Sequence, residues 1–370
     1  MEKVIIYGGT FDPVTSEHIN IIKELAKIDG VKKVIVVPNY QPPHKLNAST
    51  PAFYRKEALA IAVSGVDNVE ISDFEINQKK AVYSFVTVEH FKSLYPEDRL
   101  YFAMGTDMLA EFSLWKNPER ILALADVILV EREGGGDNAK AISYFEKSYG
   151  KKVYQISYKG KNVSSQEVRL RLYLSLDAGE MLTDEVKEYI KTKNLYKPNR
   201  YYEYINQVLP EKRRKHTLGV ILCGRKIAKK LRADQVQTEI ACLLHDNAKY
   251  LSYKRYKDFV LPENAPKSVE HQFLGAFIAE RILGVSDKEI IEAIKCHTTG
   301  KADMTLLEKI VFTADVIERG RTFEGVEKLR KSVEEDFEKG FAACVCDLYA
   351  SLKEEGDVYY LTKQAYDFYK

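Results

Sequence analysis

The pattern of apolar and polar positions changes once along the chain. In the first part, short apolar runs alternate with stretches of helical periodicity, which is typical of a parallel α/β sheet. Beyond about residue 200 the pattern is almost wholly that of amphipathic helices. The runs predicted as strands are residues 4–7, 34–37, 69–71, 100–103 and 127–130.

The change of pattern predicts two domains. Proline stops the preceding helical pattern at Lys197-Pro198-Asn199-Arg200, and no strand pattern follows it. We therefore predict an α/β domain over residues 1–197 and an all-α helical bundle over residues 200–370. A chain of 370 residues is long enough for two hydrophobic cores.

Polar side chains repeatedly end apolar runs in the second domain. A lone histidine is more often a solvated or packed side chain than a metal ligand. Here, however, imidazoles and carboxylates follow buried-type runs on separate helical segments, where an unpaired aspartate is costly to bury. These donor types hold divalent metals, so we expect one buried metal centre. The candidate ligands are His216, His245, Asp246, His271, His297 and Asp315.

A separated His, an adjacent His-Asp pair and a distant Asp resemble the HD-domain phosphohydrolases. Further motifs are similar to the bacterial HD subfamily that hydrolyses diadenosine tetraphosphate symmetrically into two ADP. The resemblance implies two divalent metals, usually iron, held by all six candidate ligands, with His271 and His297 completing the second site. The motifs are residues 243–249 (LLHDNAK), 271–276 (HQFLGA), 297–300 (HTTG) and 314–319 (ADVIER).

The implied hydrolase chemistry assigns roles to residues beside the ligands. Two neighbouring cations lower the pKa of a bridging water and neutralise the phosphate under attack. Asp246 would act at this centre, and Lys249, one helical turn after His245, would bind a phosphate oxygen. Further substrate contacts would come from the hydroxyls of Thr298 and Thr299 and from close backbone approach at Gly300.

The first domain opens with a strand, a glycine turn and a helix. The apolar run 4–7 leads into residues 8–13 (GGTFDP), and a helical pattern begins near Ser16. This arrangement presents backbone N–H groups and the positive end of a helix to a phosphate. A glycine pair alone would be weak evidence for such a site.

The surrounding motifs resemble the nucleotidyltransferase superfamily with the (Thr/His)-x-Gly-His motif, and its nicotinate-mononucleotide adenylyltransferase branch in particular. The resemblance spans residues 3–197 and implies a Rossmann-like fold. It implies transfer of AMP from ATP to nicotinate mononucleotide, with Mg²⁺, in an in-line displacement that releases pyrophosphate. The motifs are residues 8–18 (GGTFDPVTSEH), 37–45 (VPNYQPPHK), 105–107 (GTD), 112–115 (FSLW) and 163–169 (VSSQEVR).

The same resemblance implies which residues contact the nucleotides. His18, Lys45 and Arg169 would act on the phosphates during transfer, Asp107 would contact ribose or adenine, and Trp115 would stack on the pyridine ring. Other interpretations stay open, because Ser164 could simply cap a helix with Glu167, Asp107 could be a helix cap, and Trp115 could be a packing residue. The full implied set is Gly8, Gly9, Thr10, Phe11, Thr15, His18, His44, Lys45, Gly105, Asp107, Trp115, Ser164, Ser165 and Arg169.

The first domain departs from this branch at four places. Glu17 stands where the family has glycine, and its carboxylate would place a negative charge at the helix start that receives ATP. Thr15 replaces the usual histidine, Gln166 replaces a threonine, and residues 82–87 (VYSFVT) replace the usual Ser-Tyr-Thr segment. Two hypotheses follow: a working adenylyltransferase, or a weakened domain or nucleotide-binding regulatory module beside an active HD hydrolase.

Composition restricts the kinds of binding partner and the cellular compartment that we expect for this chain. The net charge is +2, from 56 basic and 54 acidic residues, which argues against nucleic-acid binding. The five cysteines lie in the second domain without a Cys-x-x-Cys spacing. With no signal peptide and no membrane-length apolar stretch, we expect a cytoplasmic protein without a membrane partner. The sequence does not determine the oligomeric state, and a homodimer is kept as an option.

Overall fold

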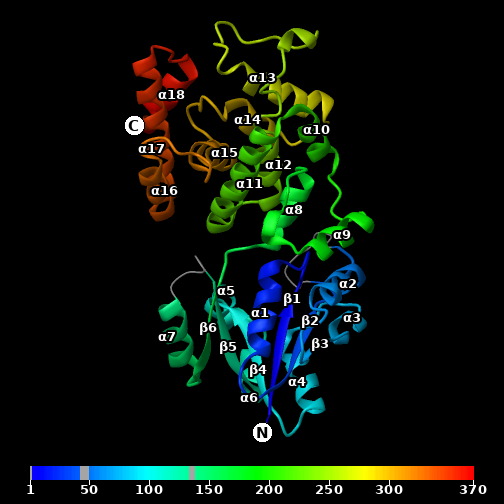
Figure 1. Cartoon of the computed structure of the whole chain (residues 1–370). Helices are drawn as coiled ribbons and strands as arrows, with labels where there is room; N and C mark the ends of the chain where they lie inside the picture. The colour runs from blue at the N-terminus through cyan, green and yellow to red at the C-terminus, as the bar shows by residue number, and fades with distance from the viewer. Residues whose placement is uncertain (1, 42–49, 133–137) are drawn as a thin grey trace. The chain divides into compact units, whose positions relative to one another are not determined.

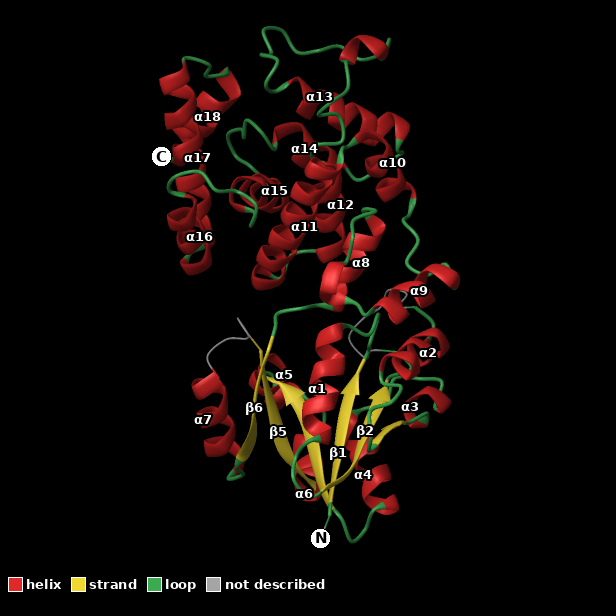
Figure 2. Cartoon of the chain, viewed as in Figure 1, coloured by secondary structure: helices red, strands yellow, loops and turns green. Residues whose placement is uncertain are grey.

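The computed structural model describes residues 2–41, 50–132 and 138–370. The chain divides into two compact units, one formed by Met1–Arg169 and Ala178–Tyr196, the other by Leu170–Asp177 and Lys197–Lys370. The first unit is a Rossmann-like α/β domain and the second is helical (Figure 1; Figure 2). The predicted fold class is confirmed.

The first unit contains a six-stranded parallel sheet in the order β3-β2-β1-β4-β5-β6. The five predicted runs all lie within strands. β6 was not predicted, because Tyr154, Gln155 and Lys159 interrupt its apolar pattern at the exposed edge of the sheet. The strands are β1 (Lys3–Gly9), β2 (Val31–Pro38), β3 (Val69–Ile71), β4 (Arg99–Gly105), β5 (Ala125–Arg132) and β6 (Val153–Gly160).

Helices cover both faces of the sheet. Alternate strand residues such as Ile6, Phe102 and Leu129 form one core with apolar residues of α4, α6 and α7. α1 lies on the other face, in front of the sheet in Figure 2, and buries Ile19 and Ile22. The helices of the sequence up to residue 192 are α1 (Ser16–Ala26), α2 (Ala52–Ala62), α3 (Phe74–Asn77), α4 (Ser84–Leu94), α5 (Thr106–Ala110), α6 (Pro118–Leu124), α7 (Asn138–Tyr149), α8 (Ser165–Tyr173) and α9 (Asp184–Thr192).

The order of the strands predicts the position of a binding crevice in the first unit. β1 pairs with β2 on one side and with β4 on the other, so the chain reverses its direction across the sheet between β1 and β4. Ligands of such sheets bind outside the carboxyl ends of the strands at this point. The glycine turn after β1 and Gly105 at the end of β4 both lie at that edge.

The second unit is a helical bundle whose largest hydrophobic core lies among α10 to α15, with a second core where α16, α17 and α18 pack on it. Ile205, Val220, Leu243, Ile294 and Val311 contribute to the largest core from five different helices. Among the helices of the described residues, none is both long and apolar enough to cross a membrane. The helices are α10 (Arg200–Val208), α11 (Glu211–Leu231), α12 (Gln235–Leu244), α13 (Glu270–Phe277), α14 (Lys288–Cys296), α15 (Leu306–Ile317), α16 (Val326–Glu335), α17 (Phe337–Glu355) and α18 (Tyr360–Tyr369).

Candidate metal centre and nucleotide site

The structure brings the six candidate metal ligands together from five helices of the second unit. His216 lies on α11, His271 on α13 and Asp315 on α15. His245 and His297 directly follow α12 and α14, so each continues an apolar helix into the interior. His245 is fully buried, and Asp246 beside it is 2% exposed. The placement explains why polar donors end apolar runs along the sequence.

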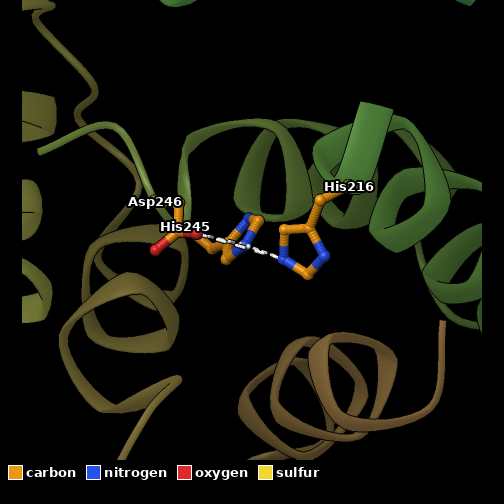
Figure 3. Close-up of side chains that lie close together, drawn as sticks. All are labelled: His216, His245 and Asp246. Atoms are coloured by element: carbon orange, nitrogen blue, oxygen red, sulfur yellow. Dashed lines mark hydrogen bonds and ion pairs between the residues drawn. The ribbon is translucent and has the colours of Figure 1, made fainter. Parts of the chain in front are cut away.

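Asp246 lies at the centre of the cluster, with one carboxylate oxygen on each side. Its Oδ2 is 3.4 Å from Nε2 of His245 and 3.9 Å from Nε2 of His216. Its Oδ1 is 3.2 Å from Nε2 of His271 and 3.6 Å from Nε2 of His297. Figure 3 shows His216 and His245 on the Oδ2 side. Two triads that could each hold a metal ion therefore share Asp246, and the donor atoms of each lie within 4.8 Å of one another.

Asp315 adds a donor to the first of these sides, and three contacts orient the rings. Its Oδ1 is 3.0 Å from Nε2 of His216. Nδ1 of His245 and Nδ1 of His297 each lie 2.7 Å from a backbone carbonyl oxygen at the end of their own helix. Nδ1 of His216 lies 3.1 Å from Oε1 of Glu318. Nδ1–H donation to these oxygens leaves the Nε2 lone pair for a metal ion.

The protonation states also suit divalent cations. Burial lowers the pKa of His245 and brings the pKa of His271 to about 4. Both rings are therefore neutral, and each can offer a nitrogen lone pair to a metal ion. Burial by itself raises the pKa of Asp246, but the surrounding imidazoles, His245 first, hold it well below its usual range. The result is a buried cluster in which His245 and His271 are neutral imidazoles and Asp246 is an ionised carboxylate, which is the donor chemistry of a divalent metal site.

Two of the predicted substrate-binding residues of this unit lie directly against the cluster. Nζ of Lys249 is 3.1 Å from Nε2 of His271, and burial lowers the pKa of this lysine. Oγ1 of Thr298 is 3.1 Å from Nε2 of His271 and 3.0 Å from Nε2 of His297. Both side chains are therefore within reach of anything held by the ligands.

Thr299 and Gly300 have structural explanations instead. Thr299 is 1% exposed, and its hydroxyl donates to the carbonyl oxygen of Gly300 and accepts from Nε2 of Gln272. Gly300 has a positive φ of 65° after α14, and a Cβ there would lie 3.2 Å from Cβ of Ala365. The turn and the packing against α18 account for this glycine.

In the first unit, His18 is fixed at the start of α1. The backbone N–H of Thr15 donates to Nδ1 of His18 at 3.0 Å, and the backbone N–H of His18 donates to Oγ1 of Thr15 at 3.3 Å. This reciprocal pair is a capping box in which histidine stands in for the usual Glu or Gln. Before it, a Cβ at Gly9 would lie 2.7 Å from Cζ of Phe11, so the turn after β1 requires glycine there. A Cβ added at Gly8, by contrast, would meet no heavy atom within 4 Å.

The beginning of α8 is bonded to the same turn. Oγ of Ser165 donates to the carbonyl oxygen of Pro13 at 2.8 Å, and Nη1 of Arg169 donates to that of Asp12. Oγ of Ser164 accepts from the backbone N–H of Glu167, as in the helix-capping interpretation. Ser165 and Arg169 therefore hold the loop that precedes α1.

The remaining predicted nucleotide contacts are spread around the crevice. Oγ1 of Thr10 accepts from Nδ2 of Asn39 at 3.1 Å, and Asp107 is exposed in the first turn of α5. Gly105 is close to Asp107, because a Cβ there would lie 2.8 Å from its Oδ1. Trp115 is half-buried against the rings of Phe102 and Phe112. His44 and Lys45 lie outside the described residues.

Comparisons with known proteins agree with this two-part organisation. Residues 6–171 match the cytidylyltransferase-like family and residues 213–320 match the HD domain. The chain is 30% identical over 328 residues to the "Probable nicotinate-nucleotide adenylyltransferase/Ap4A hydrolase" of Mycoplasma genitalium, covering 87% of this chain and 89% of the relative. This chain belongs to that two-domain family.

Other relatives match one half of the two-domain adenylyltransferase/HD chain. A "Probable nicotinate-nucleotide adenylyltransferase" of Clostridium botulinum is 33% identical over 196 residues, covering 52% of this chain and 98% of the relative. A solved structure described as a predicted HD superfamily hydrolase involved in NAD metabolism, from Clostridium acetobutylicum, is 31% identical. It covers 46% of this chain and 95% of its own, with a TM-score of 0.42.

Sequence reasoning on the adenylyltransferase/HD chain missed two buried residues that shape its sites. Arg55 is 1% exposed, and its guanidinium donates to the carbonyl oxygens of Thr10, Asn39 and Tyr40, which joins the loops after β1 and β2. Glu318 is 3% exposed and contacts His216. Arg55 belongs to no motif that would have indicated its role. Glu318 lies within the ADVIER motif, three residues after a ligand, and that spacing could have indicated it.

The structure also shows where the unusual Glu17 of the adenylyltransferase domain points. Its side chain is 2% exposed, and Oε1 accepts a hydrogen bond of 2.8 Å from the hydroxyl of Tyr158 on β6. A Cβ at Gly160 would lie 2.5 Å from the same oxygen, so that glycine makes room for the carboxylate. Burial, followed by Glu17, raises the pKa of Tyr158 to about 12. The carboxylate is thus directed at β6.

This placement predicts that Glu17→Gly leaves the KM for ATP within about twofold of the wild type. The variant should be less stable, because the Tyr158 hydroxyl loses a buried acceptor at a cost of about 1–3 kcal/mol. Pyrophosphate release and thermal unfolding measure the two effects, with Glu17→Gln as the control that keeps an acceptor. A severalfold gain in activity or ATP affinity on removing the carboxylate would show that it acts in the crevice after all.

Glu318 in the HD domain gives a second prediction. Replacing it with Gln should weaken metal binding about 10- to 100-fold, because it removes the charge that orients His216. Titration of the metal-free protein with Mn²⁺ measures this, and Glu335→Gln, whose side chain is 66% exposed on α16, is the control. Equal affinities for wild type and Glu318→Gln would exclude a role for Glu318 in positioning His216.

Proposed function

We propose that the HD domain hydrolyses diadenosine tetraphosphate symmetrically into two ADP at a centre of two divalent metals, with iron as the resident metal. One observation carries the proposal: each oxygen of Asp246 faces its own pair of imidazoles. A carboxylate in that position could supply one oxygen to each of two metal ions. The Mycoplasma relative, which is named as both an adenylyltransferase and an Ap4A hydrolase, supports the choice of substrate.

The residues of the chain would have different roles in this hydrolysis. When bound, the two cations supply a water of lowered pKa and stabilise negative charge on the phosphate. Asp246 would supply an oxygen to each cation, and the four imidazoles with Asp315 would complete the ligand set. Lys249 donates to a phosphate oxygen of the substrate, and the Thr298 hydroxyl lies on the same side. These two groups would orient the chain of phosphates for cleavage at its middle.

The products test this assignment. The full chain, loaded with Fe²⁺ or Mn²⁺, is incubated with diadenosine tetraphosphate, and the nucleotides are separated by anion exchange. ADP as the sole product supports symmetrical hydrolysis. Equal amounts of ATP and AMP would instead show attack at an outer phosphate. Unchanged substrate would exclude hydrolysis of diadenosine tetraphosphate by this domain.

We also propose that the first domain transfers AMP from ATP to nicotinate mononucleotide with Mg²⁺. The support is the arrangement of the turn after β1, the fixed His18 and the start of α8 at the crevice where the strand order reverses. The reaction needs positioning and charge stabilisation, with no covalent intermediate. His18 would donate to the ATP phosphates, while Ser165 and Arg169 hold the loop against which they bind.

Pyrophosphate release tests this half. The assay is run with ATP and nicotinate mononucleotide, and in parallel with nicotinamide mononucleotide. Release that depends on the nicotinate form supports the proposal. Release with the nicotinamide form alone would change the substrate, and no release with either, in a chain whose HD domain is active, would favour a weakened or regulatory first domain.

A further inference from the structure

Two residues without an assigned role lie one helical turn outside the ligands of the HD domain. Arg213 precedes His216 by three positions on α11, and Tyr250 follows Asp246 by four positions in a run of turns. Residues three or four apart on a helical turn share a face. Each of the two therefore lies on the same side as a metal ligand.

Arg213 is bonded to the bridging carboxylate. Its Nη1 is 2.8 Å from Oδ2 of Asp246, and its side chain is 25% exposed. Burial lowers the pKa of Arg213, but the Asp246 carboxylate and the Tyr250 hydroxyl raise it above its usual value. The guanidinium thus interacts with both the Asp246 carboxylate and the hydroxyl of Tyr250, a residue that is 59% exposed.

Arg213 would need a new partner when the centre is loaded. Two divalent cations on the oxygens of Asp246 neutralise the charge that now pairs with the guanidinium. A partly buried cation left without an anion is costly. The planar guanidinium matches two oxygens of a phosphate. Lys249, 3.9 Å from Oδ1 of Asp246, places a second cation at the other oxygen of the same carboxylate. An incoming polyphosphate supplies that anion.

Tyr250 extends this position towards solvent. A single exposed aromatic ring is ordinary by itself. Here Tyr250 directly follows Lys249 in the turns after Asp246, and its hydroxyl interacts with Arg213, so the ring lies close to both groups that would bind phosphate. An aromatic face next to a phosphate-binding cation suits a nucleotide, because the base can stack while its phosphates reach the cation.

We propose that Arg213 and Tyr250 form a nucleotide subsite of the HD centre, in which Arg213 binds a phosphate and Tyr250 stacks on the attached base. This inference rests on the proposed hydrolase function. It adds the residues that would distinguish a dinucleoside polyphosphate from a bare polyphosphate.

Binding measurements separate the two roles. Calorimetry on the metal-loaded full chain uses two probes: the analogue of diadenosine tetraphosphate with a methylene group between its two central phosphorus atoms, and inorganic tripolyphosphate. The part of the binding heat of each probe that is lost in the Asp246→Asn variant is assigned to binding at this centre. Tyr250→Ala should weaken the analogue about tenfold and leave tripolyphosphate unchanged. Arg213→Gln should weaken binding of both probes, while Tyr250→Phe, which keeps the stacking ring, should bind the analogue more tightly than Tyr250→Ala does.

A matched control and two adverse outcomes complete the test. Tyr144 on α7 is 57% exposed, almost the same as Tyr250, and Tyr144→Ala should bind both probes normally. If the wild type binds the analogue no better than Asp246→Asn does, the proposed hydrolase site itself is wrong. If the wild type binds it but Tyr250→Ala and Arg213→Gln bind it equally well, the hydrolase proposal stands and this subsite is overturned.

Discussion

Asp246→Asn is expected to remove both metal ions from the HD domain and to lower hydrolysis of diadenosine tetraphosphate on the order of a thousandfold. The substitution takes away the charge of the one residue that faces both histidine pairs. Metal-assisted stabilisation of a phosphate under attack contributes several kcal/mol, and each 1.4 kcal/mol is tenfold in rate. Metal analysis and ADP release measure the two losses.

The controls for Asp246→Asn come from the same chain. Asp258→Asn, at an exposed position between α12 and α13, should retain both metals and full hydrolysis. Pyrophosphate release by the first domain should be unchanged in both variants. An Asp246→Asn protein that still holds two metals and hydrolyses the substrate would rule out the bridging role.

His18→Ala is expected to lower kcat of the adenylyltransferase about 10²- to 10³-fold, with a smaller effect on KM. A fixed donor to the charge that develops in a transition state contributes about this much. The capping box already fixes the ring through Nδ1, so little has to be ordered when ATP binds. Pyrophosphate release at varied ATP concentration separates kcat from KM.

A second histidine of the same unit serves as the control for His18→Ala. His90 lies on α4 with its ring stacked on that of Phe74, the ring centroids 3.8 Å apart, and it belongs to none of the five nucleotide motifs. His90→Ala should lose thermal stability and keep its turnover. If His18→Ala turns over like His90→Ala, the phosphate-binding role of His18 is wrong.

The strands show how far the sequence predicts this fold. Buried parallel strands read as continuous apolar runs, so β1, β2, β4 and β5 are visible in the sequence, and the short β3 is found as well. β6 is not recognisable in the sequence, because this edge strand is half-exposed and carries Tyr154 and Lys159 among its apolar residues. The order of the strands was not predicted, because periodicity does not reveal which strands pair.

The candidate metal centre was predictable for a different reason. Histidine and aspartate are uncommon after buried apolar runs, so His245, His297 and Asp315 stand out in the amino-acid sequence alone. Of the residues that support them, Glu318 is indicated only by its place in the ADVIER motif, and Arg213 does not stand out. Both are common surface types, and their contacts with His216 and Asp246 depend on how α11 packs against α15 and α12.

Proximity to a motif also predicted contacts that the structure explains otherwise. Gly300 follows His297 closely, yet its missing side chain faces Ala365 on a helix more than sixty residues later. Ser165 and Arg169 lie in a motif typical of phosphate binding, and they are bonded to the backbone of the Asp12-Pro13 turn. Such partners are distant in sequence, so only the folded chain identifies them.

An anomalous difference map of the full chain, crystallised after purification with its own metal and recorded at the absorption edge of iron, tests the central claim most directly. Two peaks about 3.5–4 Å apart are expected, one beside each oxygen of Asp246. His216, His245 and Asp315 should contact the first ion, and His271 and His297 the second. A single peak, or metal bound away from Asp246, would contradict the two-metal centre.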